Sequence, residues 1–179
     1  MKRFANVVLL VALLVLPMSA SADHVGIYND ANGTSCFLAN PSGLVSVYIV
    51  HIYTLGTRGS QFTFQDQSGQ LFLAAVPLDG SIPVGDPSTG IQVAYSDCYV
   101  GHFAPFRLDY LITTPIVPCQ NRLRILPYPG DTNVMVVDCS LLFKPATGGE
   151  FVFGPPECTG CSANPTAETT WGGVKALYK

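Results

Sequence analysis

Two cysteines separated by two residues, Cys158 and Cys161, are the side chains with the clearest potential for chemistry in this chain. Thiols at this spacing form redox-active dithiols or supply half of a zinc site. A redox dithiol belongs at a helix N-terminus in an α/β context, whereas this pair lies among Pro, Gly and small polar residues. A zinc site needs two further ligands, and the three histidines, His24, His51 and His102, are far apart in the sequence. We therefore favour a small structural disulfide and predict no metal and no cofactor.

Carboxylates are the second group with catalytic potential. Asp97, His102 and Asp109 fall within thirteen positions and could meet around a loop, but no Gly-x-Ser-x-Gly nucleophile pattern accompanies them. The sequence also lacks phosphate-loop, EF-hand and HExxH patterns. We therefore predict a protein without catalytic residues. The alternative is a carbohydrate-active or other extracellular hydrolase that assembles carboxylates such as Asp79, Asp97 or Asp109 from its loops.

The N-terminus has the pattern of a cleavable export signal. Lys2 and Arg3 precede an apolar run at 7–16, and a small-x-small triplet follows at 20–22. The run has ten residues, whereas a membrane-spanning helix needs about 20. We therefore predict that residues 1–22 are removed on export and that no transmembrane span remains. The mature protein is then secreted, either extracellular or in the periplasm or cell envelope.

The charge of the chain limits the classes of partner. Nine Lys and Arg, two of them in the predicted signal, stand against twelve Asp and Glu, so the exported part has a net charge of −5. This balance argues against electrostatic binding of nucleic acid or of anionic membranes. Charged residues are only 12% of the chain, well below the usual fraction, which leaves little charge repulsion against association.

Six cysteines in the predicted mature chain indicate three disulfides, because an even number in an exported chain forms a bridged framework. They are Cys36, Cys98, Cys119, Cys139, Cys158 and Cys161. Cys119 and Cys139 flank two predicted strands joined by a Pro-rich turn, and a hairpin would bring these ends together. We therefore expect the bridges Cys119–Cys139, Cys36–Cys98 and Cys158–Cys161, among the fifteen pairings that six cysteines allow.

Strand patterns dominate the predicted mature chain. Runs of Val, Ile, Leu, Tyr and Phe are separated by short turns rich in Gly, Pro, Asp and Ser. We predict an all-β fold over residues 23–154: an immunoglobulin-like or jelly-roll sandwich of seven to nine strands, with a barrel as the rival. The predicted strands are 44–55, 61–64, 70–76, 91–95, 106–113, 122–126, 134–138 and 151–153.

Two strand patterns carry more specific expectations. The run at 44–55 is apolar on both faces, which is typical of a strand covered on both sides or bent between two sheets, and its His51 is expected to be a satisfied core or edge residue. Outward arginines at 107, 122 and 124 are expected to pair with Asp109 and Glu150 rather than to bind an anionic ligand.

The C-terminal part differs from the rest of the chain. Residues 155–168 are predicted to be a linker containing Cys and Pro, and residues 169–179 a short helical or extended amphipathic tail. This tail either docks on a partner or packs back on the sandwich. In a helix, one face of it would carry Trp171, Val174, Leu177 and Tyr178.

Five segments carry the most characteristic motifs: the opening Asp23–Tyr28, the block 91–98, the strand end 136–139, the Cys-rich segment and the ending Thr-Thr-Trp-Gly-x-x-Lys-Ala-Leu-Tyr. Together they resemble a group of uncharacterised secreted bacterial proteins. The resemblance implies a bacterial exported protein and adds no catalytic residue. With the composition, it favours a structural or binding module at the cell envelope or outside the cell, with a protein or glycan partner.

Deletion of residues 169–179 tests the docking interpretation of the tail. If the tail is a docking element, the shortened protein is exported and folds, but its retention at the cell surface falls, as measured by fractionation. Unchanged export and unchanged surface retention would favour the packed-back alternative.

Overall fold

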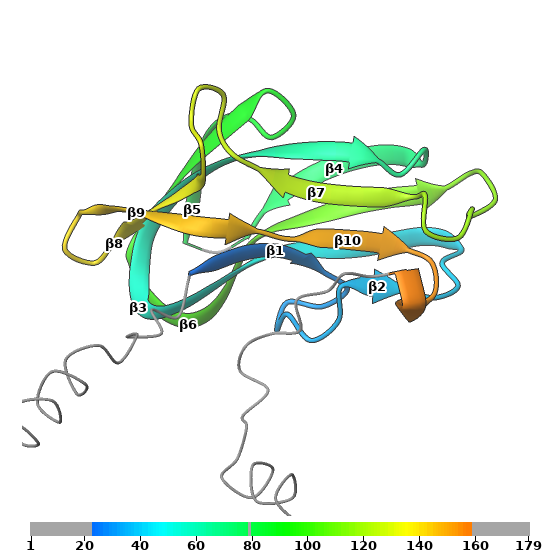
Figure 1. The fold of residues 1–179 in the computed structure, drawn as a ribbon, viewed down its shortest axis with the longest axis horizontal. Coiled ribbons are helices and arrows are strands. Elements are labelled where there is room, and N and C mark those ends of the chain that lie inside the picture. The colour runs from blue at the N-terminus through cyan, green and yellow to red at the C-terminus, as the bar shows by residue number, and fades with distance from the viewer. Residues whose placement is uncertain (1–22, 79, 159–179) are drawn as a thin grey trace, which may run out of the picture.

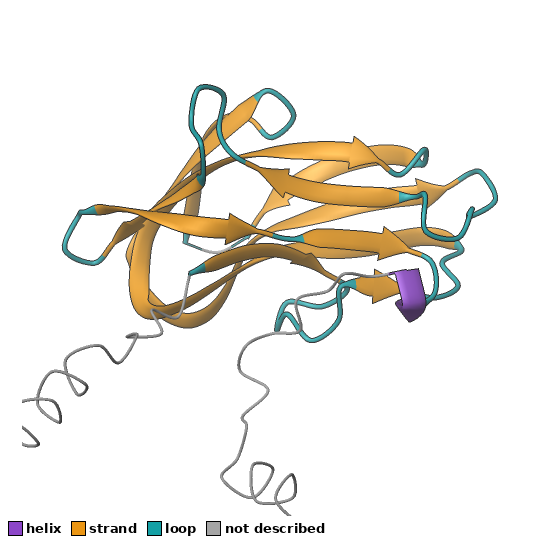
Figure 2. Ribbon diagram, viewed as in Figure 1, coloured by secondary structure: helices purple, strands orange, loops and turns teal. Residues whose placement is uncertain are grey.

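Ten strands make up the fold of the computed structural model, which describes residues 23–158 except Asp79 and leaves out the side chains of Thr54 and Cys158. The all-β prediction is confirmed, with one strand more than expected (Figure 2). The strands are β1 (His24–Tyr28), β2 (Phe37–Leu38), β3 (Gly43–Gln67), β4 (Leu71–Pro77), β5 (Ser81–Asp86), β6 (Gly90–Ile112), β7 (Arg122–Leu126), β8 (Val134–Asp138), β9 (Phe143–Gly148) and β10 (Glu150–Phe153), and a 3-10 turn, η1 (Pro156–Cys158), follows them. No helix in this described part is long and apolar enough to cross a membrane.

Two very long strands organise the sandwich. β3 has 25 residues and β6 has 23, and they pair antiparallel from Gly43 opposite Ile112 to Phe62 opposite Ile91. The sequence predicted four separate strands in these regions. They are continuous because glycines with positive φ, Gly56 and Gly101, lie where the register shifts, and such irregularities let a strand bend.

The bend distributes the two long strands over both layers of a jelly-roll-like sandwich (Figure 1). The first part of β3 pairs with β1 and with the second part of β6, which β4 extends. The second part of β3 pairs with β8, β7 and the first part of β6, which β5 extends. β9 and β10 add to β8 and β7, and β1 also pairs with β9, so the layers are joined on one side.

The strands β7 and β8 do not form the predicted hairpin. Both pair antiparallel with β3, one after the other, from Arg122 opposite Gln67 to Asp138 opposite Thr57. Their outer ends are therefore separated by about 30 Å of strand, whereas the Cα atoms of a disulfide lie within about 7 Å. The predicted bridge Cys119–Cys139 is wrong for this reason.

The observed bridge joins Cys98 of β6 to Cys139, with a Cα–Cα distance of 5.5 Å. The predicted Cys36–Cys98 bridge is therefore also wrong. Cys36 and Cys119 are disulfide-bonded as well. The predicted Cys158–Cys161 bridge lies outside the described side chains. The prediction that these four described cysteines are bridged holds, although their partners could not be assigned from local pattern.

The core lies between the layers and includes six aromatic side chains that are almost wholly buried: Tyr53, Phe62, Phe106, Tyr110, Phe151 and Phe153. A second, smaller cluster covers the other face of β3, where Val50 and Ile52 pack with Tyr28 and Cys36. This second cluster explains why the 44–55 run is apolar on both faces.

One hydrogen-bonded chain of polar groups runs through the main core. The His51 Nδ1 atom lies 2.6 Å from the Tyr95 hydroxyl, which lies 2.8 Å from the Ser60 hydroxyl. His51 is fully buried, and burial, with a smaller contribution from the charge on His24, lowers the pKa of His51 to about 3. The expectation that His51 is a satisfied core residue is confirmed.

The buried His51 should make stability depend on pH. Between its ordinary pKa of 6.5 and about 3, the unfolded chain binds a proton that the folded protein excludes, so stability is greatest above pH 6.5 and falls as the pH drops. The loss approaches about 1.4 kcal/mol per pH unit. The free energy of unfolding, measured by chemical denaturation at several pH values, should depend less on pH for His51→Gln than for the native protein. The same pH dependence of the free energy of unfolding in His51→Gln and in the native protein would contradict this prediction.

Loss of the observed bridge should destabilise the protein. Cys98 and Cys139 are 41 residues apart, so Cys98→Ser should cost about 4 kcal/mol in the chain-entropy model. Denaturant titration measures the loss. Peptide mapping without reduction should recover the two cysteines in one linked pair of peptides, and recovery of Cys119 linked to Cys139 would contradict the structure.

Candidate interaction surface

Five neighbouring strand segments present an apolar outer face. In order across the sheet they are β5, the first part of β6, the second part of β3, β8 and β9. Inward positions such as Val93 and Val136 are buried, so the alternate positions point outward. These outward positions form two aligned rows, which we call the apolar face: Ile82, Ala94, Gly59, Val137 and Phe143 in one row, and Val84, Gln92, Gln61, Met135 and Pro145 in the other.

Three members of the apolar face are strongly exposed: Ile82 at 61%, Val84 at 65% and Phe143 at 65%. None of the ten residues is charged, and the two glutamines lie within 3.4 Å of each other in a hydrogen bond. A cavity of about 230 Å³ on this face is lined in part by Val84, Val137 and Phe143. Single exposed apolar side chains are ordinary, but an aligned set over five strands indicates a contact surface.

The sequence patterns did not predict β5 and β9, the two outer strands of this face. β5 contains Pro83 and Gly85, and β9 contains Pro145 and Gly148, so both segments have the composition of turns. Proline is tolerated in an edge strand, where its missing N–H group breaks no ladder hydrogen bond. The alternation of Ile82 and Val84 around Pro83 was the available signal.

Apolar exposure continues past Phe143 to the disulfide at the bend. Leu141 and Leu142 in the turn between β8 and β9 are exposed, as are Leu55 and Val100 on the two long strands. Gly56 follows Leu55, and a Cβ atom at Gly56 would lie 2.7 Å from Cys139 Sγ and 3.0 Å from Val100 Cγ2. The bridge therefore packs directly against the bend of β3.

The exposed leucines of this turn are held in a defined conformation. Leu141 has a φ of 64°, which is uncommon for a residue other than glycine. The Asp138 Oδ1 atom accepts hydrogen bonds from the backbone N–H groups of Ser140 and Leu142, and Oδ2 lies 2.7 Å from Lys144 Nζ. These contacts lower the pKa of Asp138, the hydrogen bond from Lys144 most of all. A strained residue held this firmly is a feature of functional surfaces.

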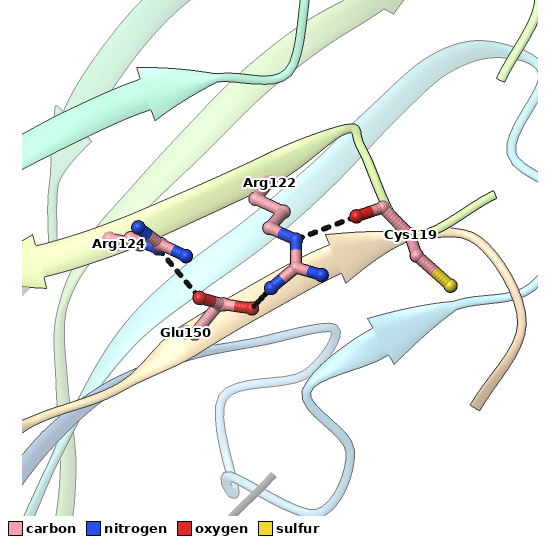
Figure 3. Close-up of polar contacts among 4 residues, drawn as sticks. All are labelled: Cys119, Arg122, Arg124 and Glu150. Atoms are coloured by element: carbon pink, nitrogen blue, oxygen red, sulfur yellow. Dashed lines mark hydrogen bonds and ion pairs between the residues drawn. The ribbon is translucent and has the colours of Figure 1, made fainter. Parts of the chain in front are cut away.

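The three outward arginines are paired as expected. Arg107 donates twice to Asp109, with distances of 3.0 and 3.1 Å. Arg122 and Arg124 share Glu150, with N–O distances of 2.5 and 2.6 Å, and Arg122 Nε also donates to the Cys119 carbonyl (Figure 3).

The carboxylates of the hydrolase alternative are not gathered by loops. β6 contains Asp97, His102 and Asp109, so the hypothesis that a loop brings these side chains together is wrong. Asp109 is engaged by Arg107 and by the Ser46 hydroxyl, and Arg107 lowers its pKa. Asp79 lies outside the described residues. In the part of the chain that the structure describes, no group of three His, Cys, Asp or Glu side chains could hold a metal ion.

Several predicted segments lie outside the described residues. They are the export signal at 1–22, most of the linker at 155–168, Cys161, and the tail with Trp171, Val174, Leu177 and Tyr178. These remain predictions from the sequence.

Comparison with known proteins identifies the type of fold. No protein-family model matches the chain, and no curated protein sequence matches it. The cohesin module from the Clostridium perfringens ATCC13124 family 33 glycoside hydrolase is similar with a TM-score of 0.50 and 8% identity, over 74% of this chain and 97% of that chain. A non-cellulosomal cohesin from the archaeon Archaeoglobus fulgidus has a TM-score of 0.49 and 14% identity, over 76% of this chain and 94% of that chain.

The first likeness shows that the chain has a β-sandwich fold of the kind found in cohesin modules. At 8% identity it concerns the fold alone, so function has to be argued from the surfaces of this chain.

Proposed function

We propose that this protein is a secreted, disulfide-stabilised β-sandwich module that binds another protein at the cell envelope or outside the cell. The observation that carries the proposal is the apolar face, whose two uncharged rows cross β5, β6, β3, β8 and β9 and are most exposed at Ile82 and Val84 on β5 and at Phe143 on β9. Burial of such side chains is the main driving force of protein association.

The chemistry of the face favours a protein partner over a glycan. A glycan presents many hydroxyl groups that need hydrogen-bond partners, and its apolar ring faces usually stack on exposed aromatic side chains. The apolar face offers Gln61 and Gln92, already hydrogen-bonded to each other, and one aromatic residue, Phe143, among its ten members. We infer a partner whose own contact surface is apolar and uncharged.

Secretion is supported by the export pattern at 1–22 and by the cystine content. The Cys98–Cys139 bridge, together with the bonded Cys36 and Cys119, requires an oxidising compartment to form and persist. The resemblance to secreted bacterial proteins adds a bacterial envelope as the setting. The tail at 169–179 would then provide a second attachment, separate from the apolar face.

A photo-crosslinking amino acid at position 84 tests the proposal in the native host. We expect a discrete crosslinked product at Val84 and none at Val117, which is also exposed but lies in the connection between β6 and β7. Adding Phe143→Lys should abolish the product while changing the free energy of unfolding by less than about 0.5 kcal/mol, because the site is exposed.

Two outcomes would contradict a partner protein at this face. Equal products at positions 84 and 117 would show that the apolar face is not selective. A product of twice the monomer mass would show that the face binds a second copy of this chain.

A further inference from the structure

A second site lies away from the apolar face, between β1, β7 and the junction of β9 and β10. It is a cavity of about 350 Å³, within the usual size range for a small-molecule pocket. It shares no lining residue with the apolar face. The polar side chains in its wall are His24, Tyr28, Arg124 and Glu150.

Three glycines form the backbone of this cavity and are required there. A Cβ atom at Gly149 would lie 2.8 Å from the Gly26 Cα atom, and one at Gly148 would collide with the Ile125 carbonyl oxygen. Because these backbones approach so closely, the cavity is bounded by main chain below and by the side chains of β1 and β7 around it. The close contact between these backbone segments fixes the positions of the polar side chains that they carry.

Two polar aromatic side chains of the wall are more than nine-tenths buried. His24 is 7% exposed and its Nδ1 atom lies 2.8 Å from Thr147 Oγ1, which leaves Nε2 without another partner among the described residues. Tyr28 is 4% exposed, and its ring lies over Gly26, where a Cβ atom would come within 2.6 Å of Tyr28 Cε2. Burial lowers the pKa of His24 and raises the pKa of Tyr28 to about 12, so at neutral pH the ring is uncharged and the hydroxyl keeps its proton.

Arg124 and Glu150 of the wall belong to a cluster with Arg122, which does not line the cavity, and this cluster has one positive charge in excess. Glu150 is a single carboxylate shared by two guanidinium groups, those of Arg122 and Arg124 (Figure 3). Arg124 uses Nε for Glu150, and its two terminal nitrogens make no hydrogen bond or ion pair to a described residue. The Glu150 contact therefore holds the guanidinium in place with two donors to spare. A singly charged anion matches the net charge of this cluster.

We propose that this cavity binds the carboxylate group of a small polar ligand, with the terminal nitrogens of Arg124 and the Tyr28 hydroxyl as donors to the carboxylate. The His24 ring lies beside it to hydrogen-bond a hydroxyl or amide of the same ligand. An acidic sugar and an acylated amino acid share this chemistry. The residues that line this cavity are not part of the apolar face, which is the proposed contact surface for a partner protein.

Titration of the mature protein with galacturonate, N-acetylserine and neutral galactose, followed by amide NMR, tests the site. We expect saturable shifts at Gly26, Gly148 and Gly149 with at least one of the two carboxylates, and none with galactose. The stronger of the two carboxylates identifies the source of the ligand. Absence of shifts with both carboxylates, or equal shifts with galactose, would overturn the proposal.

Variants separate the site from general effects on folding. Arg124→Gln should weaken carboxylate binding about tenfold or more, because a charge-assisted hydrogen bond is lost. Tyr28→Phe removes only a hydroxyl and should weaken binding several-fold. Arg107→Gln, which also removes an ion-paired arginine, should leave binding unchanged. Equal losses for Arg124→Gln and Arg107→Gln, or full binding by Tyr28→Phe, would assign the effect to charge in general.

Discussion

The pairing of β3 with β6 is the constraint on which the rest of the structure depends. These strands remain hydrogen-bonded from Gly43 opposite Ile112 to Phe62 opposite Ile91, and they bend together rather than ending at the layer boundary. Every other strand except β2, β9 and β10 pairs with one of them. A one-residue slip of this pairing would turn the side chains of both strands from core to surface. The two-layered core therefore depends on the register of this pairing on both sides of the bend.

The bend explains why the bridge and the exposed leucines occur together. The register shifts between Tyr53 and Gly59, and Cys98 lies in the part of β6 opposite this irregularity. Cys139 follows β8, whose last residue, Asp138, pairs with Thr57. The disulfide thus links β6 to the end of β8 at the bend, where the regular hydrogen bonds between β3 and β6 are interrupted. Cys139 also lies between β8, which belongs to the apolar face, and the β8–β9 turn, so the disulfide constrains both.

The two surfaces proposed for binding differ in chemistry because they lie on different strands. The apolar face is built of uncharged outward positions and suits a large, dry contact. The cavity beside Arg124 has buried polar groups and a glycine backbone, adjoins a cluster with one excess positive charge, and suits a small ion. In a protein with so few charged residues, an arginine pair sharing one carboxylate is a local exception to the negative net charge.

Sequence by itself determined the features that depend on local pattern. Alternation placed Arg122 and Arg124 outward on β7, and the apolar runs indicated an all-β sandwich. These succeed because side chains alternate with a period of two whatever the partner strand. The two apolar faces of the 44–55 run likewise indicated that this strand is covered on both sides.

Only the tertiary structure decided which segments meet. Cys98 bonds to Cys139 because β7 and β8 follow one another along β3 instead of pairing together. β5 and β9 are strands because neighbours in the sheet satisfy backbone groups of residues that look like turns. His24, Tyr28, Arg124 and Glu150 share a cavity although about a hundred residues separate the first two from the last two. Such contacts depend on the register between strands that are distant in the sequence, and this register cannot be predicted from local composition.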